Sequence, residues 1–214
     1  MSFESNMQDL IIKAKMLDGR IASYNFDLML DGILYNAFIR CYHPELIGTV
    51  TKEFTDFSLP LATHKMPSGD WYYLCSRAFF KSEEEDIAFF NKKQDLDLAA
   101  DYLNDDKSKK DIADARGKYK AHRVAMIVKY TKEITWYAHG FKSEIEKLLN
   151  YINAIGYKRN IGYGLVKEWI VEPHKKIQFD KSIRPIPDYQ GNCIKRIRPP
   201  YHCYKHERRC SYDL

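Results

Sequence analysis

Apolar and polar side chains alternate near the start of the chain, and the pattern then changes to a helical period. Over residues 10–16 every second position is apolar, and Lys13 and Lys15 fall on the opposite face, which predicts a half-buried strand. Over residues 26–41 apolar positions recur every three or four residues. This spacing predicts an amphipathic helix with Asn25 as its N-cap.

The middle of the chain predicts further strands. Residues 71–80 are almost continuously apolar and aromatic, which favours a strand, but Arg77 interrupts them. Such an arginine needs a bound phosphate or an internal salt bridge, unless it faces outward. Two alternating runs, residues 124–130 and 134–139, flank the turn Thr131-Lys132-Glu133 and predict a hairpin.

A second helix is predicted after this hairpin. Ser143 and Glu146 have the spacing of a capping box ahead of an apolar pattern, and we expect the helix to end at Gly156. A strand over residues 165–171 follows. The order of elements predicts an α+β fold of ferredoxin-like (RRM-like) type, with two main helices on one face of an antiparallel sheet.

Length and composition favour one domain with two additions. A chain of 214 residues can bury a core of its own, so we expect a single domain over residues 1–214. Residues 81–120 are rich in Lys, Asp and Glu, which predicts a charged, partly helical insertion or a solvated loop. Residues 174–214 hold repeated prolines and basic side chains, typical of an irregular, extended basic tail.

The connection between the second helix and the last strand is long and rich in glycine. Gly156, Gly162 and Gly164 bracket the tripeptide Lys158-Arg159-Asn160. Glycine permits positive φ and close approach of another backbone. A basic loop of this kind, with its amides and tyrosines, is suited to a phosphodiester chain. The alternative is a C-cap glycine and an ordinary turn, with the basic residues there for solubility.

The net charge of +5 is unevenly distributed. Residues 1–155 carry 21 Lys and Arg against 23 Asp and Glu, a net of −2, whereas residues 156–214 carry 13 against 6, a net of +7. This asymmetry favours a polyanion such as nucleic acid, and a tail that only aids solubility is the alternative. The chain has no membrane-spanning apolar run and no signal peptide, so we expect a cytoplasmic protein with reduced cysteines.

Several motifs occur in an order that resembles a known family. Residues 156–164, Gly-Tyr-Lys-Arg-Asn-Ile-Gly-Tyr-Gly, resemble the glycine-rich loop of the RAMP superfamily of CRISPR proteins. Other segments are similar to motifs of the subunit that caps the 5′ end of the guide RNA in type IV CRISPR effector complexes: Asp31-Gly32-Ile33-Leu34, Leu59-Pro60-Leu61-Ala62 with Gly69-Asp70-Trp71-Tyr72, Arg184-Pro185-Ile186-Pro187 and Arg198-Pro199-Pro200-Tyr201. The resemblance covers residues 10–201, and the insertion matches no motif.

The resemblance implies a non-catalytic RNA-binding protein with no cofactor and no metal. Such a subunit holds the 5′ handle of the CRISPR RNA within a defence ribonucleoprotein. It contacts the backbone subunit and the large subunit of the effector complex, lies near the PAM of the target DNA, and has no membrane partner. Pairing with the guide, rather than protein side chains, reads the target sequence.

We expect the glycine-rich connection to supply most of the RNA contacts. Amides near its glycines would meet phosphates, Lys158 and Arg159 would add charge, and Tyr157 or Tyr163 would stack on a base or serve as a core anchor. The candidate RNA-binding residues are Gly156, Tyr157, Lys158, Arg159, Asn160, Gly162, Tyr163 and Gly164, and, on local context alone, Lys65, Arg77, Arg123, Arg196 and Arg198.

Three alternatives remain open at the level of sequence. A metal-independent ribonuclease that processes precursor CRISPR RNA would need an acid and a base, which His64, His122 and His139 with Tyr73 or Tyr163 could supply. A structural zinc site could use the C-x9-C-x2-H-x3-C pattern of Cys193, Cys203, His206 and Cys210. The pattern lacks a paired C-x2-C and fits no common zinc finger, so unrelated thiols in a basic tail are the favoured explanation. A subunit that contacts only proteins is the third.

Overall fold

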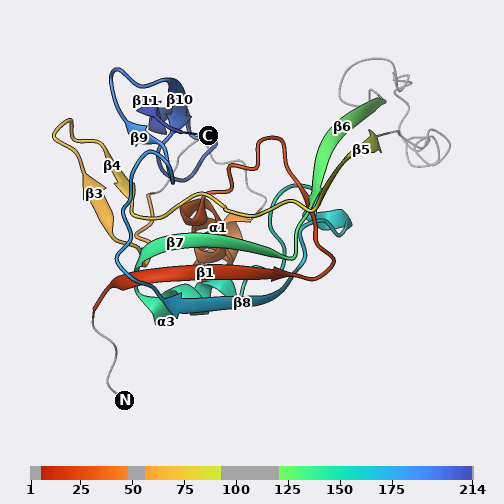
Figure 1. Cartoon of the computed structure of the whole chain (residues 1–214), viewed down its shortest axis with the longest axis horizontal. Helices are drawn as coiled ribbons and strands as arrows, with labels where there is room; N and C mark the ends of the chain where they lie inside the picture. The colour runs from red at the N-terminus through yellow and green to blue at the C-terminus, as the bar shows by residue number, and fades with distance from the viewer. Residues whose placement is uncertain (1–5, 48–55, 93–120, 214) are drawn as a thin grey trace, which may run out of the picture.

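A three-stranded antiparallel sheet and two helices form the centre of the molecule (Figure 1). The computed structural model describes residues 6–47, 56–92 and 121–213. β1 (Gln8–Met16) lies between β7 (Glu133–Gly140) and β8 (Val166–Pro173). The helices α1 (Leu30–Tyr42) and α3 (Lys142–Leu149) pack on one face of this sheet. The alternating burial along β1 confirms the predicted half-buried strand.

The core lies between this sheet and the helices. Its largest fully buried side chains come from β1, β7, α1 and α3, and they include Leu10, Ile12, Leu34, Trp136 and Ile145. Burying one such aliphatic or aromatic side chain contributes about 1.5–3 kcal/mol. The central sheet and both helices therefore form one unit, and the predicted α+β class with antiparallel strands and two helices is confirmed.

The strand predicted over residues 71–80 is regular only at its beginning. β4 (Trp71–Tyr73) pairs with β3 (Thr63–Lys65), and the chain then continues along β7 through isolated bridges at Cys75 and Phe79. Between those bridges the Arg77 amide donates to the Ile183 carbonyl oxygen at 2.8 Å. The Ser76 amide donates to Tyr137 and the Phe79 amide to Thr135, so three residues of this segment span two of β7, and this one-residue slip interrupts regular pairing.

The two strands predicted as a hairpin belong to different sheets. β6 (His122–Tyr130) pairs with β2 (Arg20–Ala22) and β5 (Glu84–Lys92), whereas β7 pairs with β1. The turn between β6 and β7 passes from one sheet to the other, because its Thr131 amide donates to the Gly19 carbonyl oxygen at 2.9 Å. The hairpin prediction is therefore wrong in its pairing.

Part of the predicted insertion is regular structure. Strand β5 falls within residues 81–120 and pairs with β6 along its whole length. The pair extends away from the central sheet (Figure 1). The remainder of the predicted insertion, residues 93–120, lies outside the described residues.

Backbone contacts, rather than the predicted cap, set the start of the first helix. α1 begins at Leu30, and not at residue 26, because the Leu30 amide donates to the Ser76 carbonyl oxygen at 3.2 Å. Asn25 instead accepts an N–H from Asp27 at 3.2 Å in the turn before the helix. The N-cap prediction for Asn25 is wrong, since no side chain among the described residues caps this helix.

The second helix is shorter than predicted. α3 ends at Leu149 rather than at Gly156, and the capping box of Ser143 and Glu146 does not form within the described structure. The residues after Leu149 leave the helix because the Ile155 amide donates to the Gly164 carbonyl oxygen at 2.9 Å. In the described part of the chain, none of the helices is both long and apolar enough to cross a membrane.

The C-terminal segment, predicted as an irregular tail, contains a small sheet. β11 (Glu207–Ser211) lies between β10 (Cys193–Arg196) and β9 (Ile186–Pro187). This sheet lies above the central sheet and beside the β3–β4 hairpin (Figure 1). Prolines alone predicted an extended segment, whereas Gly191 allows a tight turn in which an added Cβ would come within 2.1 Å of the Cys210 backbone.

A buried ion pair connects this segment to α1. Asp31 and Arg184 are both fully buried, and Arg184 Nη2 lies 3.8 Å from Asp31 Oδ2. The Tyr201 hydroxyl donates to Asp31 Oδ1 at 2.7 Å. The guanidinium also donates to the carbonyl oxygens of Tyr73 and Ile197. Burial raises the pKa of the Asp31 carboxyl, and the positive charge of Arg184 opposes this rise.

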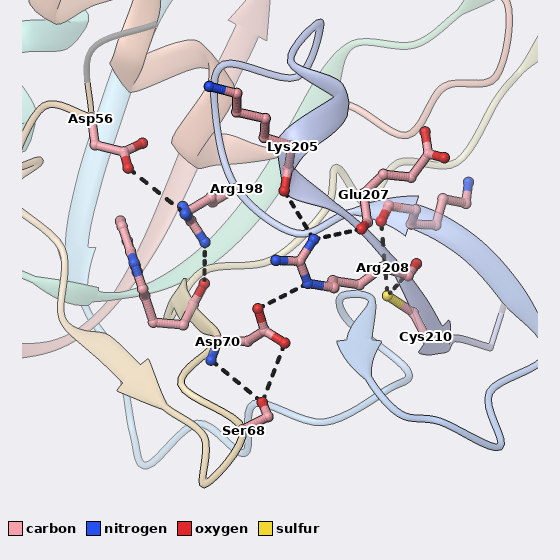
Figure 2. A network of polar contacts seen from close by, with 10 residues as sticks. Asp56, Ser68, Asp70, Arg198, Lys205, Glu207, Arg208 and Cys210 are labelled. Atoms are coloured by element: carbon pink, nitrogen blue, oxygen red, sulfur yellow. Dashed lines mark hydrogen bonds and ion pairs between the residues drawn. The ribbon is translucent and has the colours of Figure 1, made fainter.

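A second polar network fastens the C-terminal sheet to the β3–β4 hairpin (Figure 2). Arg208 on β11 donates from Nε to Asp70 Oδ1 at 2.8 Å. The Arg198 guanidinium lies over the Trp71 ring at 4.3 Å, and its Nη2 is 3.7 Å from Asp56 Oδ2. The C-terminal segment is thus bound to the body of the protein through its basic side chains.

Removal of the buried carboxylate tests this connection. We expect Asp31→Ala to lower the free energy of unfolding by about 3–5 kcal/mol, because it leaves the buried Arg184 without its ion-pair partner. Asp213→Ala is the matched control, since its pair with Lys181 is exposed, and we expect a change of at most about 1 kcal/mol. Urea unfolding measures both, and equal losses in the two variants would contradict the assignment.

Candidate nucleic-acid interface

The glycine-rich connection forms a closed loop with its basic residues at the tip. A bridge between Ala154 and Leu165 closes the base of the loop. The tip is a single 3-10 turn, η3 (Arg159–Ile161), between two residues in the left-handed region, Lys158 with φ 57° and Gly162 with φ 90°. The turn holds Arg159 and its neighbours away from the core, so they are available for a ligand.

Two glycines allow this loop to dock on strand β2. The Tyr157 amide donates to the Ala22 carbonyl oxygen at 2.7 Å, and the Gly164 amide donates to the Arg20 carbonyl oxygen at 2.7 Å. A Cβ at Gly156 would come within 2.8 Å of the Ala22 oxygen, and one at Gly164 within 1.8 Å of the Ile155 oxygen. The predicted use of glycine for positive φ and close backbone approach is therefore confirmed.

The same contacts bear on the expected role of the loop amides. Gly162 donates its N–H to the Arg159 carbonyl oxygen at 3.2 Å, and Gly164 donates to Arg20. Because both donors are satisfied within the protein, neither can meet a phosphate without losing an internal hydrogen bond. A phosphate held by the side chains of this loop would leave these two hydrogen bonds intact.

A cleft of about 530 Å³ lies against this loop, within the size range of ligand sites. The loop contributes Gly156, Tyr157, Lys158, Arg159 and Asn160 to its wall. The last turn of α1 contributes Arg40, and the segment after α3 contributes Tyr151 and Asn153. The fold thus brings five of the sequence-predicted residues together with residues that the sequence did not identify, among them Arg40, Tyr151 and Asn153.

The charge of this cleft is positive and uncompensated. Its described lining residues include Arg40, Lys158 and Arg159 but no Asp or Glu. Partial desolvation, and then the nearby positive charge of Arg40, lower the pKa of the Arg159 guanidinium from its ordinary value. Arg40 is held in place by donating from Nε to Asn36 Oδ1 at 2.9 Å. Two arginines held near one another, with no carboxylate among the described lining residues, can together attract an anion.

The two tyrosines of the loop have different surroundings. Tyr157 is 45% exposed, and its ring centroid lies 5.1 Å from that of Tyr24, which is 61% exposed. Tyr163 packs under the β5–β6 pair, with its ring centroid 5.5 Å from that of Phe90 and the Arg20 guanidinium 5.2 Å away. Tyr157 is therefore the one of the two available for base stacking, and Tyr163 is a packing anchor.

The second group of candidates lies elsewhere in the fold. Arg198 belongs to the network that holds the C-terminal sheet, and Arg196 lies 3.7 Å from Glu207 and donates to the Tyr201 carbonyl oxygen. Arg77 lies over the rings of Phe79 and Tyr212, at 5.3 and 5.4 Å, so its partners in the described structure are aromatic. Arg123 lies over Phe89 on the β5–β6 pair, at 3.9 Å, and Lys65 is exposed on β3. None of these five residues lines the cleft as described.

Among the described residues, two of those named for acid–base chemistry are engaged by other protein groups, and those named for zinc form no cluster of ligands. Tyr73 is buried, its hydroxyl donates to the Phe57 carbonyl oxygen at 2.7 Å, and desolvation raises its pKa to about 12. His139 pairs with Asp9, with 2.6 Å between Nδ1 and Oδ1. Cys193 and Cys210 are register partners on β10 and β11, but no group of three or more potential ligands gathers among the described residues.

Sequence reasoning missed Arg40, Tyr151 and Asn153 in the cleft, and Tyr24 beside Tyr157. Arg40 follows the periodic pattern of α1 as an ordinary polar position, and Tyr24 lies in a bend. Docking of the loop on β2 places Tyr157 beside Tyr24, and the packing of α1 against α3 brings Arg40 to the cleft. No local pattern in the sequence marks them.

Comparison with known proteins agrees with the sequence resemblance. A family model described as Csf3, CRISPR type IV associated protein Csf3, matches residues 9–212. No curated protein matches the chain at a significant level. The matched region includes the central sheet, both helices, the glycine-rich loop and the C-terminal sheet.

Two glycines of the loop give a matched pair of variants. At Gly162, φ is positive and no other atom lies within 4 Å of an added Cβ, so Gly162→Ala should cost about 1–2 kcal/mol of backbone strain. At Gly164 φ is also positive, and an added Cβ would in addition clash with the Ile155 carbonyl oxygen. We expect Gly164→Ala to lose at least about twice as much stability in urea unfolding. Equal losses would contradict the close approach.

Proposed function

The chain belongs to the Csf3 family of CRISPR type IV associated proteins, and on this premise we propose that it is a non-catalytic RNA-binding subunit that holds the 5′ handle of the CRISPR RNA. One observation carries the proposal. The cleft at the glycine-rich loop holds Arg40, Lys158 and Arg159 without a carboxylate among its described lining residues, beside the exposed ring of Tyr157. Phosphate contacts and stacking of splayed bases are the two ways in which proteins hold single-stranded RNA.

The shape of the surface next to the cleft supports a strand rather than a small anion. The cleft shares Ile152, Ala154, Gly156 and Arg159 with a pocket of about 320 Å³, which has the size of a ligand site. The 320 Å³ pocket in turn shares Asp27, Met29 and Tyr201 with a further pocket. This further pocket extends to Lys195 and Arg196 on β10. A groove thus runs from the glycine-rich loop along the start of α1 to the C-terminal sheet.

The arrangement of the central elements supports a ferredoxin-like RAMP fold as the scaffold of this site. β1, α1, β7, α3 and β8 follow one another in the chain, and β1 lies between the other two strands. The bridged segment after β4 runs on the free side of β7, where such a fold has its remaining strand. The small additional sheets are elaborations of this scaffold.

The family also supports a place in a multisubunit complex. Type IV CRISPR association favours other Csf subunits as partners. We propose contacts with the backbone subunit and the large subunit, and a position near the PAM end of the target DNA. Base pairing by the guide would then read the target, and this subunit would fix one end of the guide.

Reversal of charge in the cleft tests RNA binding. We expect Lys158→Glu with Arg159→Glu to weaken binding of repeat-derived guide RNA at least about tenfold, because each charge-assisted contact contributes about 1.5–3 kcal/mol. The slope of log affinity against log salt should also fall by at least about 1.4 for two lost phosphate contacts. Fluorescence anisotropy across a salt series measures both quantities.

The control changes the same charges at a distant site. Lys175 and Lys176 are adjacent, exposed and follow the far end of β8 from the loop. Lys175→Glu with Lys176→Glu should leave the affinity within about threefold, since exposed charges beyond a Debye length are screened. If both double variants weaken binding equally, the cleft is not the RNA site.

The non-catalytic assignment has its own test. We expect the purified protein to leave repeat RNA intact during incubation in EDTA, because the buried Tyr73 with its raised pKa is a poor acid and His139 is engaged by Asp9. Denaturing gels of end-labelled RNA provide the measurement. Discrete products that disappear in His139→Ala would replace this assignment with a metal-independent ribonuclease.

A further inference from the structure

The pocket beside the cationic cleft differs from it in character. Its walls are the start of α1 and the segment between α3 and the glycine-rich loop. Most of the side chains that line it are apolar, among them Met29, Ile33, Ile152 and Ile155. Its volume of about 320 Å³ is at the small end of ligand sites. A phosphate gains nothing from such walls, whereas a flat, weakly polar ring does.

Apart from Arg159, the polar side chains described in the lining of this pocket leave one directed donor, on Asn36, for a ligand. Asp27 is already engaged, since Oδ2 accepts from Lys195 at 2.7 Å and Oδ1 accepts from the Tyr212 hydroxyl at 2.6 Å. Asn36 uses Oδ1 to accept from Arg40 Nε at 2.9 Å. This bond orients the amide so that its NH2 group is the end left to donate to a ligand. The pocket thus offers an apolar slot with one directed donor.

One wall joins the slot to the anion site. Arg159 lines both the pocket and the cleft, and Gly156 lies between them without a side chain. Arginines of the cleft suit the phosphate of a nucleotide, and the adjoining apolar pocket suits its base. A nucleotide carries its anionic phosphate and its aromatic base on opposite sides of a ribose.

We infer that this pocket receives the base of one RNA nucleotide whose phosphate lies on Arg40 and Arg159. The inference rests on the proposed function for the source of the nucleotide, since a free nucleoside phosphate has the same chemistry. The Asn36 amide donates to an acceptor on the edge of the base, and the apolar walls cover its faces. The subunit would then hold one nucleotide of the guide in a fixed position, with its base turned out of the strand.

Titration of the full-length, 15N-labelled protein tests the inference in solution. The probes are AMP, adenosine and ribose 5-phosphate, followed by tetra-adenylate. We expect AMP and adenosine to shift the side-chain NH2 signal of Asn36, and AMP and ribose 5-phosphate to shift the Nε–H signal of Arg159. AMP should bind at least about tenfold more tightly than ribose 5-phosphate, because its base adds contacts in the pocket.

A matched pair of substitutions separates the base from the phosphate. Asn36→Leu removes the donor without adding a negative charge beside Arg40, so it should weaken AMP and adenosine and leave ribose 5-phosphate within about twofold. Asn160 lines the cleft but not this pocket. Asn160→Asp adds a negative charge there and should weaken AMP and ribose 5-phosphate alike.

The outcomes distinguish the inference from the proposed function. If ribose 5-phosphate shifts Arg159 but neither AMP nor adenosine shifts Asn36 at millimolar concentration, the base pocket is wrong and the anion site stands. Binding of AMP without binding of tetra-adenylate would also overturn the inference, because the pocket would then serve a free nucleotide. If guide RNA binds normally to the variant with both Lys158→Glu and Arg159→Glu, the proposed function itself fails, regardless of the results of the nucleotide titrations.

Discussion

The buried pair of Asp31 and Arg184 is the contact on which the arrangement of this protein depends. It joins α1 to the C-terminal segment, and Tyr201 completes it from a second point of that segment. Gly32 belongs to the same contact, since an added Cβ there would lie 3.0 Å from the Tyr201 ring. Three motifs that resemble the family, far apart in the chain, thus meet at one place. Their common role is to hold the two parts of the molecule together.

The same principle accounts for much of the charge asymmetry. Basic residues of the C-terminal part pair with acidic residues of the preceding part, as Lys195 does with Asp27 and Arg208 with Asp70. A large part of the basic excess is therefore used within the protein rather than on a partner. The cleft at the glycine-rich loop differs, because its described lining holds cations and no carboxylate. That difference, and not the net charge, supports the proposal that the cleft binds an anion.

The glycine-rich loop connects this architecture to function. Gly156 and Gly164 let the loop approach β2 and its own base, and its amides are used for that purpose. The loop can therefore present Lys158 and Arg159 on a short 3-10 turn that lines the same cleft as Arg40. Under the proposed function, a preformed cationic wall would need little ordering when RNA binds. The adjoining apolar pocket would then add a means of holding a base, which phosphate contacts alone do not provide.

The sequence by itself determined the elements with clear periodicity and strong local chemistry. Alternation in β1, the apolar face of α1 and the glycines of the loop have local causes, and each was predicted. Pairing of β6 with β2, the ends of α3 and the position of Arg40 were decided only by tertiary structure. These features depend on partners distant in the chain, such as Ser76 at the start of α1. Local pattern cannot specify them, because the acceptor of a backbone N–H, or the partner of a charged side chain, is a residue that only the folded chain brings near.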